Sequence, residues 1–204
     1  MRREIRWAPL LTLALFLALA GCARLGGLKD EFDPRLSTPD KAYQEAIEPY
    51  RVKASIHGGP ATELMATALP LTATVRRAMV ERQANAQALP EAGRQALMDQ
   101  QAADLARGLE VVISVYVPET RWNDLAGAKP DWEVFIQQAG GARFKPLDTR
   151  RLKDRSALAE ALYPFWGAWD RLYRLRFAPQ AAQAGASLVI SGAPGRVDMP
   201  LKLD

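Results

Sequence analysis

The chain has 204 residues, of which 49% are hydrophobic and 25% are charged, and its formal net charge is +4. This composition is that of a globular protein and not of a disordered or fibrous one. Arg2, Arg3, Arg6 and Glu4 account for half of the net charge, so the rest of the chain is only slightly basic and no nucleic-acid partner is expected.

The first residues have the pattern of an export signal. A basic start is followed by a fourteen-residue, mainly apolar run, Trp7–Ala20. Because a helix needs about 20 apolar residues to cross a bilayer, this run is short for a permanent anchor and typical of a signal peptide. It leads into Leu19-Ala20-Gly21-Cys22, which holds the single cysteine of the chain. No disulfide within the chain is therefore possible.

This N-terminus resembles that of bacterial lipoproteins, in which the lipobox cysteine receives a diacylglycerol and the signal is cut just before it. The resemblance implies a signal peptide over residues 1–21 and lipidation of Cys22. Two or more acyl chains hold a protein firmly on a membrane, whereas one holds it weakly. Ala23 and Arg24 follow the cysteine in place of an aspartate. In this family an aspartate just after the cysteine favours retention at the inner membrane, so the resemblance implies delivery to the bacterial outer membrane, with the protein facing the periplasm. A free cysteine behind an ordinary signal is the alternative.

The part that follows divides into three segments. Residues 22–36 are predicted to be a mobile, lipidated tether, because they combine Gly26-Gly27 with mixed charge and Asp33-Pro34. Residues 37–108 are predicted to be mainly helical with one short strand, and residues 109–204 to be rich in strands. We expect these last two segments to form one compact unit.

The helical segment begins with a helix for which Thr38 is the expected N-cap, with Pro39 and Asp40 in the first turn. The helix should end at about Glu48, because a proline follows. Residues Arg51–Ile56 then alternate between apolar and polar side chains, which predicts a strand.

The Ala-rich stretch from Ala61 to Arg107 is predicted to be helical. Pro90 suits the first turn of a second helix and Gly108 suits its end, so we expect a helical hairpin with a turn near Ala88–Glu91. The second helix carries an apolar stripe that is expected to pack within the same domain, with docking of a partner helix as the alternative. This stripe consists of Leu97, Met98, Ala102 and Leu105.

The remainder alternates in the manner of β-strands, most clearly over Leu109–Val117. Because Pro200 cannot donate to a ladder, the last strand is expected to lie at a sheet edge or to pair through its other side. These patterns predict an α+β fold, with an antiparallel β-sandwich, immunoglobulin-like in the broad sense, preceded by the helical hairpin. The further strands are predicted at Trp132–Ile136, Arg143–Pro146, Arg171–Phe177, Ser187–Ser191 and Arg196–Asp204.

An aromatic cluster is the most unusual chemical feature of the chain. It consists of Tyr163, Phe165, Trp166, Trp169 and Tyr173. If the chain is helical after the intervening proline, Trp166, Trp169 and Tyr173 line one side. Aromatic side chains bury large areas, so the cluster is expected to plug one end of the sandwich. The alternative is an exposed aromatic groove for a partner, peptide or glycan.

A basic run over Arg143–Arg155 includes Arg150 and Arg151, and Arg174 and Arg176 could extend it into a basic face. Such a run is expected to be a solvated loop. The alternative is contact with anionic lipid headgroups, lipopolysaccharide or an acidic partner, since each Lys or Arg near an anionic membrane contributes about 1 kcal/mol.

Catalytic and metal-binding patterns are weak in this sequence. His57 is the only histidine and is expected to be an ordinary residue beside a turn, without partners for a triad or a metal site. The acidic pairs Asp131 with Glu133, and Asp198 with Asp204, are expected to be solvated. No metal or other cofactor is therefore predicted.

The sequence thus predicts a lipid-anchored cell-envelope protein with a non-catalytic interaction or assembly role and an envelope protein as its partner. It does not predict the number of subunits. The alternative is a binding module for a small ligand or glycan, with an aromatic groove around Trp166 and Trp169. An enzyme ranks last, because no set of nucleophile, base and orienting group can be assembled from these residues.

Overall fold

The computed structural model describes residues 38–204. The predicted signal peptide, Cys22 and the tether 22–36 lie outside these residues. The described part combines α-helices with two antiparallel β-sheets and is therefore an α+β fold. Among its helices, none is both long enough and apolar enough to cross a membrane.

The larger sheet, here called sheet A, has five strands, each antiparallel to its neighbours. Its two edge strands are β1 and β6, and β3 lies at its centre. In spatial order the strands are β1 (Val52–Gly58), β2 (Ala61–Pro70), β3 (Leu109–Tyr116), β7 (Arg171–Phe177) and β6 (Asp148–Leu152).

The smaller sheet, sheet B, has four antiparallel strands. The last strand of the chain lies at its edge, one of the two placements that Pro200 predicts. In spatial order the strands are β5 (Arg143–Phe144), β4 (Trp132–Gln137), β8 (Ser187–Gly192) and β9 (Gly195–Pro200).

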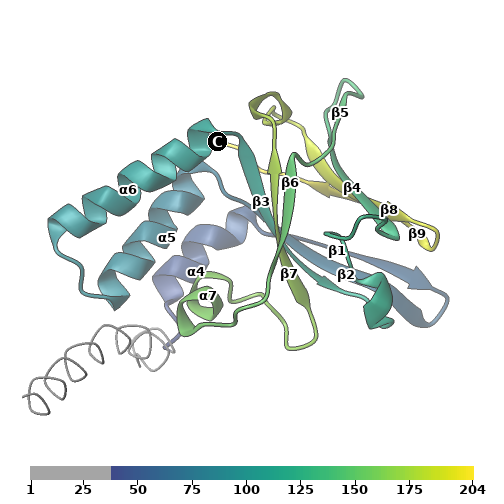
Figure 1. Cartoon of the computed structure of the whole chain (residues 1–204), viewed down its shortest axis with the longest axis horizontal. Coiled ribbons are helices and arrows are strands. Elements are labelled where there is room, and N and C mark those ends of the chain that lie inside the picture. The colour runs from purple at the N-terminus through teal and green to yellow at the C-terminus, as the bar shows by residue number, and fades with distance from the viewer. Residues whose placement is uncertain (1–37) are drawn as a thin grey trace, which may run out of the picture.

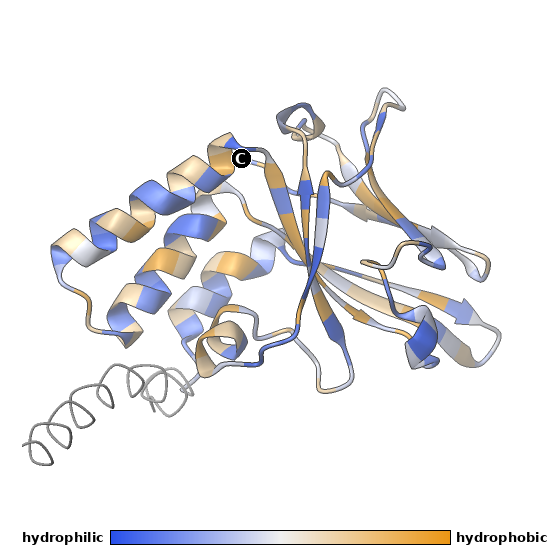
Figure 2. Ribbon diagram, viewed as in Figure 1, coloured by the Kyte–Doolittle hydropathy of each residue, from blue (hydrophilic) through white to orange (hydrophobic). Residues whose placement is uncertain are grey.

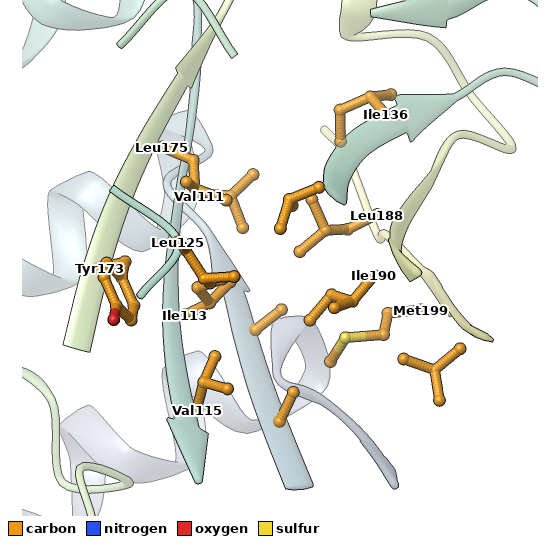
Figure 3. Close-up of a cluster of buried hydrophobic side chains, with 14 of the residues drawn as sticks. Val111, Ile113, Val115, Leu125, Ile136, Tyr173, Leu175, Leu188, Ile190 and Met199 are labelled. Atoms are coloured by element: carbon orange, nitrogen blue, oxygen red, sulfur yellow. The ribbon is translucent and has the colours of Figure 1, made fainter. Parts of the chain in front are cut away.

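The two sheets share one hydrophobic core. In Figure 3, Val111, Ile113 and Leu175 of sheet A point toward Ile136 and Leu188 of sheet B. These positions alternate along each strand with residues of the opposite face, as the period-two pattern predicts. The inward-facing side chains of nearly every predicted strand therefore lie in this core.

The helices lie on the outer face of sheet A, away from sheet B (Figure 1). A second apolar cluster joins them to the sheet through side chains such as Val75, Leu69 and Leu172. The helices are α4 (Lys41–Ile47), α5 (Ala73–Ala86), α6 (Glu91–Ala106) and α7 (Ala157–Leu162), with 3₁₀ turns at Glu48–Tyr50, Thr120–Trp122 and Pro179–Ala181.

Helix α6 differs from the other helices because it contains no buried residue. It packs beside α5, and Figure 2 shows hydrophilic and hydrophobic residues distributed along it. The predicted stripe is consequently not enclosed, and Leu105 is 37% exposed. Gly108 ends this helical region with φ +143°, where a side chain would collide with the carbonyl oxygen of Phe177.

Strand β2 shows that the helical prediction for Ala61–Arg107 is wrong over its first ten residues. Leu64, Ala66 and Ala68 point into the core, while the backbone pairs with β1 on one side and β3 on the other. Alanine and leucine favour helices in isolation, but burial and pairing on both sides outweigh that preference.

The predicted N-cap of the first helix is also wrong by two residues. Asp40, not Thr38, is the cap, and its carboxylate accepts the backbone N–H of Tyr43 at 2.9 Å. A carboxylate at the cap satisfies a free helix N–H and also meets the positive end of the helix dipole.

Candidate functional site: the Trp169 groove

A groove of about 470 Å³ opens on the outer face of sheet A where the helices do not cover it. Strands β1, β2 and β3 form its floor, and the loop before β7 forms one wall. We call it the Trp169 groove. Its lining includes Lys53, Ser55, Met65, Thr67, Ser114, Tyr116 and Trp169.

Two large apolar side chains of the groove face solvent. Trp169 is 83% exposed and Met65 is 53% exposed. Single exposed apolar residues are ordinary on protein surfaces, but two that line the same groove form a surface on which an apolar group can be buried. A tryptophan and a methionine also adapt well to differently shaped partners.

The loop that carries Trp169 is held by Asp170. The Asp170 carboxylate accepts hydrogen bonds from the Ser114 hydroxyl at 2.6 Å and from the backbone N–H of Gly167 at 3.1 Å. The indole N–H of Trp166 donates to the Asp170 carbonyl at 3.2 Å. The Ser114 bond fastens Asp170 to the sheet, and the other two bonds tie the loop to itself, while the Trp169 side chain stays outside.

Arg155 braces the same loop from its other side. Its guanidinium donates to the carbonyl oxygens of Trp166 at 2.8 Å and Gly167 at 2.9 Å, and it lies 4.4 Å from the centre of the Trp166 ring. Trp166 is half-buried by these contacts and packs against the second cluster. It therefore supports the groove wall, whereas Trp169 is the aromatic residue available for contact.

Strand β1 also carries a serine and histidine pair that the sequence analysis did not foresee, and its serine lines the groove. Ser55 Oγ lies 2.9 Å from His57 Nε2, and both residues are exposed on β1. The other ring nitrogen of His57 faces the Thr62 hydroxyl at 3.5 Å. In a catalytic triad a carboxylate orients the neutral imidazole and stabilises the imidazolium that forms when the ring accepts a proton, and a threonine hydroxyl does not replace it. Of the two residues, Ser55 is part of the polar lining of the groove.

The predicted aromatic cluster does not form one surface, so the expectation that it plugs one end of the sandwich is wrong, and the helix that would have put Trp166, Trp169 and Tyr173 on one side does not form. The segment after Pro164 is a series of turns. Tyr173 is buried in the core between the sheets, whereas Tyr163 is buried in the second cluster. Phe165 is partly buried beside Tyr163, with ring centres 6.2 Å apart.

The predicted basic loop is partly a strand, because Arg150 and Arg151 lie in β6 at the edge of sheet A. Arg150 pairs with Arg174, and those two share the outer face with Arg176. Arg151 pairs with Tyr173 and so points to the opposite face. The sheet therefore brings together three of the four predicted arginines and separates the fourth.

Other side chains and backbone groups contact three residues of the predicted acidic pairs. Glu133 pairs with Lys145 at 2.8 Å, which lowers the pKa of Glu133, and Asp198 is bound by Arg196. Asp204 accepts hydrogen bonds from Tyr50 and from the backbone of Thr74. Within residues 38–204 no group of acidic or histidine side chains is arranged to hold a metal ion.

Met65, Tyr116 and Ser114 are groove residues that the sequence analysis missed. The period-two alternation of Thr62–Leu69 carried a usable signal, since it places Met65 and Thr67 on the face opposite Leu64. The high alanine content of the region concealed that alternation.

The chain matches no protein-family model and no curated protein. Among solved structures, it is similar to the crystal structure of a protein of unknown function from Burkholderia pseudomallei. The two align with a TM-score of 0.40 and 15% sequence identity, over 79% of this chain and 82% of the other.

Proposed function

We propose that the protein is a lipid-anchored component of the cell envelope with a non-catalytic interaction or assembly role, and that the Trp169 groove is its contact surface. The single observation that carries this role is Trp169, 83% exposed on a loop fixed by hydrogen bonds and adjoining the exposed Met65. Contact energy concentrates in such aromatic anchors when a partner encloses them.

The fixed loop supports the proposal. Ordering a surface on binding costs free energy, and a loop that is already fixed costs less to order. A side chain that is immobilised by a partner loses about 0.5–1.5 kcal/mol of conformational freedom, and a preformed loop has already lost part of its own. The bonds from Ser114 and Gly167 to Asp170 hold the backbone around Trp169 before any partner arrives.

The location remains a proposal that rests on Leu19-Ala20-Gly21-Cys22 and the residues around it. With Cys22 lipidated and Ala23 and Arg24 behind it, the body would be held at the bacterial outer membrane, facing the periplasm. The envelope protein bound in the groove would then meet it close to that membrane.

For the finer architecture, we propose an immunoglobulin-like sandwich in the broad sense, with α5 and α6 as a helical hairpin. The core that both sheets share supports the first part, and the contact between consecutive helices supports the second. In this arrangement the hairpin covers part of sheet A and leaves the Trp169 groove open.

The groove is tested by photocrosslinking in cells that make the lipid-anchored chain. A photoreactive residue at Ala168, which is exposed and lines the groove, should give one discrete crosslinked product. Adding Trp169→Ala should reduce that product about thirtyfold, the effect of losing a contact worth about 2 kcal/mol. Trp122→Ala, a change at a 42% exposed tryptophan outside the groove, should leave it unchanged. Equal products from both variants would remove the groove from the proposal.

The anchor has its own test, mass spectrometry of the mature protein. The expected N-terminal residue is Cys22 carrying a thioether-linked diacylglycerol. An unmodified thiol or an uncut leader would contradict the anchoring and leave the crosslinking result to be judged separately.

A second candidate, the glycan-binding module, is favoured by the hydroxyls of Ser55, Thr67 and Ser114 beside the exposed indole. Sugar rings stack on such a face and exchange hydrogen bonds with neighbouring hydroxyls. Titration with envelope-derived oligosaccharides should then shift tryptophan fluorescence saturably, and Trp169→Ala should abolish the shift. No shift at millimolar sugar, together with the crosslinked protein product, would decide for the protein partner.

A further inference from the structure

The second feature of sheet A is a set of arginines on its outer face, outside the Trp169 groove. The strand register places Arg150 of β6 directly opposite Arg174 of β7. Two register positions further along, and so on the same face, Arg176 of β7 lies between Asp148 of β6 and Glu110 of β3. Directly opposed side chains on one face have Cβ atoms about 4.5–5.5 Å apart, so Arg150 and Arg174 are neighbours of like charge.

Both nearby carboxylates are already engaged. Asp148 Oδ2 lies 2.7 Å from Arg150 Nε, and Glu110 Oε2 lies 2.8 Å from Nη2 of the buried Arg76. The four arginines Arg76, Arg150, Arg174 and Arg176 therefore exceed the two acids by two formal positive charges.

Two guanidiniums of the set also have unused hydrogen-bonding capacity. The Nε atoms of Arg174 and Arg176 are buried and have no hydrogen-bond partner among the described residues. The side-chain contact of Arg174 is a long one, 3.4 Å from Nη2 to the Tyr163 hydroxyl. Opposed like charges on one face destabilise a folded protein, so an anion bound between Arg150 and Arg174 would offset their repulsion.

We infer that Arg150, Arg174 and Arg176 form a binding site for a phosphate group. A phosphate monoester carries a charge of about −1.5 to −2 at pH 7, which matches the excess positive charge of the set. Guanidinium groups bind phosphate oxygens through two parallel hydrogen bonds, and three arginines on adjacent strands offer several such pairs. The phosphate belongs either to a lipid headgroup or to a free phosphorylated molecule.

The competing explanation is that charge on β6 merely protects a sheet edge from pairing with other chains. That role would use Arg150 and Arg151 equally, because both lie on the edge strand and both are exposed. A phosphate site would use only Arg150, since Arg151 points to the opposite face. The two neighbouring residues thus provide a matched pair.

The test is calorimetric titration of the full-length, detergent-solubilised protein with inorganic phosphate and pyrophosphate. Binding should be saturable, and Arg150→Gln should weaken it about tenfold, the effect of one lost charge-assisted hydrogen bond. Arg151→Gln should change it less than about twofold. The side chain of Arg150 is 75% exposed, so its replacement should leave the fold intact. Arg174→Lys, which replaces a second guanidinium on the same face, should also weaken phosphate binding.

Absence of saturable binding, equal effects of Arg150→Gln and Arg151→Gln, or equally tight binding of succinate would overturn the phosphate site. Flotation of the chain made without residues 1–22, on vesicles that contain phosphatidic acid, whose headgroup is a phosphate monoester, compared with pure phosphatidylcholine vesicles, identifies the source of the group, because the acyl anchor would carry the protein to both. If Arg150→Gln also reduces flotation on the anionic vesicles, the phosphate is that of a lipid headgroup. If flotation is unchanged while phosphate binding is lost, the site takes a free phosphorylated molecule.

Discussion

Arg76 is enclosed beneath helix α5, with its side chain only 3% exposed. It donates to the Leu71 carbonyl at 3.0 Å, to Gln101 at 2.6 Å and to Glu110 at 2.8 Å. Removing one member of a buried ion pair leaves the other charge buried without compensation, which costs about 3–5 kcal/mol. We predict that Arg76→Ala lowers the free energy of unfolding in urea by about this amount.

The neighbouring Arg77 is exposed on the same helix and serves as the control, since Arg77→Ala should change the stability by less than about 0.5 kcal/mol. A similarly small loss for Arg76→Ala would mean that water hydrates the Glu110 carboxylate when Arg76 is removed. The double replacement Arg76→Met with Glu110→Leu should recover much of the lost stability, because it removes both buried charges together.

Ser114 is the residue that fixes the Trp169 loop to sheet A. Its hydroxyl donates to the Asp170 carboxylate at 2.6 Å, a hydrogen bond to a charged group in a partly buried position. Ser114→Ala should lower the free energy of unfolding by about 1–2 kcal/mol and raise the hydrogen exchange rate of residues 166–170. Ser55→Ala, which changes a groove hydroxyl away from this bond, should leave the exchange of that loop as it is in the parent chain.

The exposure of each tryptophan was beyond prediction from the sequence. Trp166 and Trp169 are three residues apart in the same short segment, yet one is half-buried and the other is 83% exposed. The difference arises from Arg155 and Asp170, whose contacts fix the path of the backbone through turns. Such long-range bonds leave no periodic trace in the chain, whereas alternating side chains do.

Among the described helices, α6 is the one whose exposure predicts local opening. It holds no buried residue and rests on α5, so few contacts oppose its local opening. We predict that the amides of α6 exchange with solvent well before those of α5, whose Val75 and Val80 are buried. Exchange at equal rates in the two helices would show that they open as one unit.

Gly93→Ala tests the same element from the opposite direction. A Cβ at this position would meet only ordinary contacts with Leu89 and Pro90, and alanine favours the helix by up to about 1 kcal/mol. The replacement should slow exchange within α6 by about fivefold or less and leave α5 unchanged. An equal slowing in α5 would contradict independent opening of α6.

The elements that were predictable are those whose pattern and neighbours agree. Leu109–Val117 was predicted as a strand because its apolar residues alternate, and β3 lies at the centre of sheet A with every residue but its last buried. The stretch Ala61–Pro70 was misjudged because its composition favours a helix while its position between two strands requires extension. The groove depends on β2, so it could be found only by following the alternation of Thr62–Leu69, which the alanine content concealed.

At the scale of the whole molecule, Asp204 joins three segments that are distant in the sequence. Its carboxylate accepts the hydroxyl of Tyr50 at 2.8 Å and, at the N-terminal end of α5, the backbone N–H of Thr74 at 2.8 Å. The contact ties the segment after sheet B to the helical layer over sheet A. A carboxylate at a helix N-terminus also stabilises the helix through its dipole.

These contacts make the stability depend on pH through Asp204. Burial raises the pKa of this carboxyl, but the hydrogen bonds from Thr74 and Tyr50 outweigh it, and the net result is a pKa below the ordinary 3.8. A carboxyl with a lowered pKa in the folded state contributes stability above its unfolded pKa and loses it as the pH falls toward the folded value. Asp204→Asn should therefore be less stable than the parent chain at pH 7, and the difference should shrink below the ordinary pKa. Urea unfolding between about pH 2.5 and pH 7 measures it.

Tyr50→Phe, which removes one of the hydrogen bonds, should give a smaller difference in stability with the same sign. A difference that stays constant over this pH range would assign the effect to packing instead of charge.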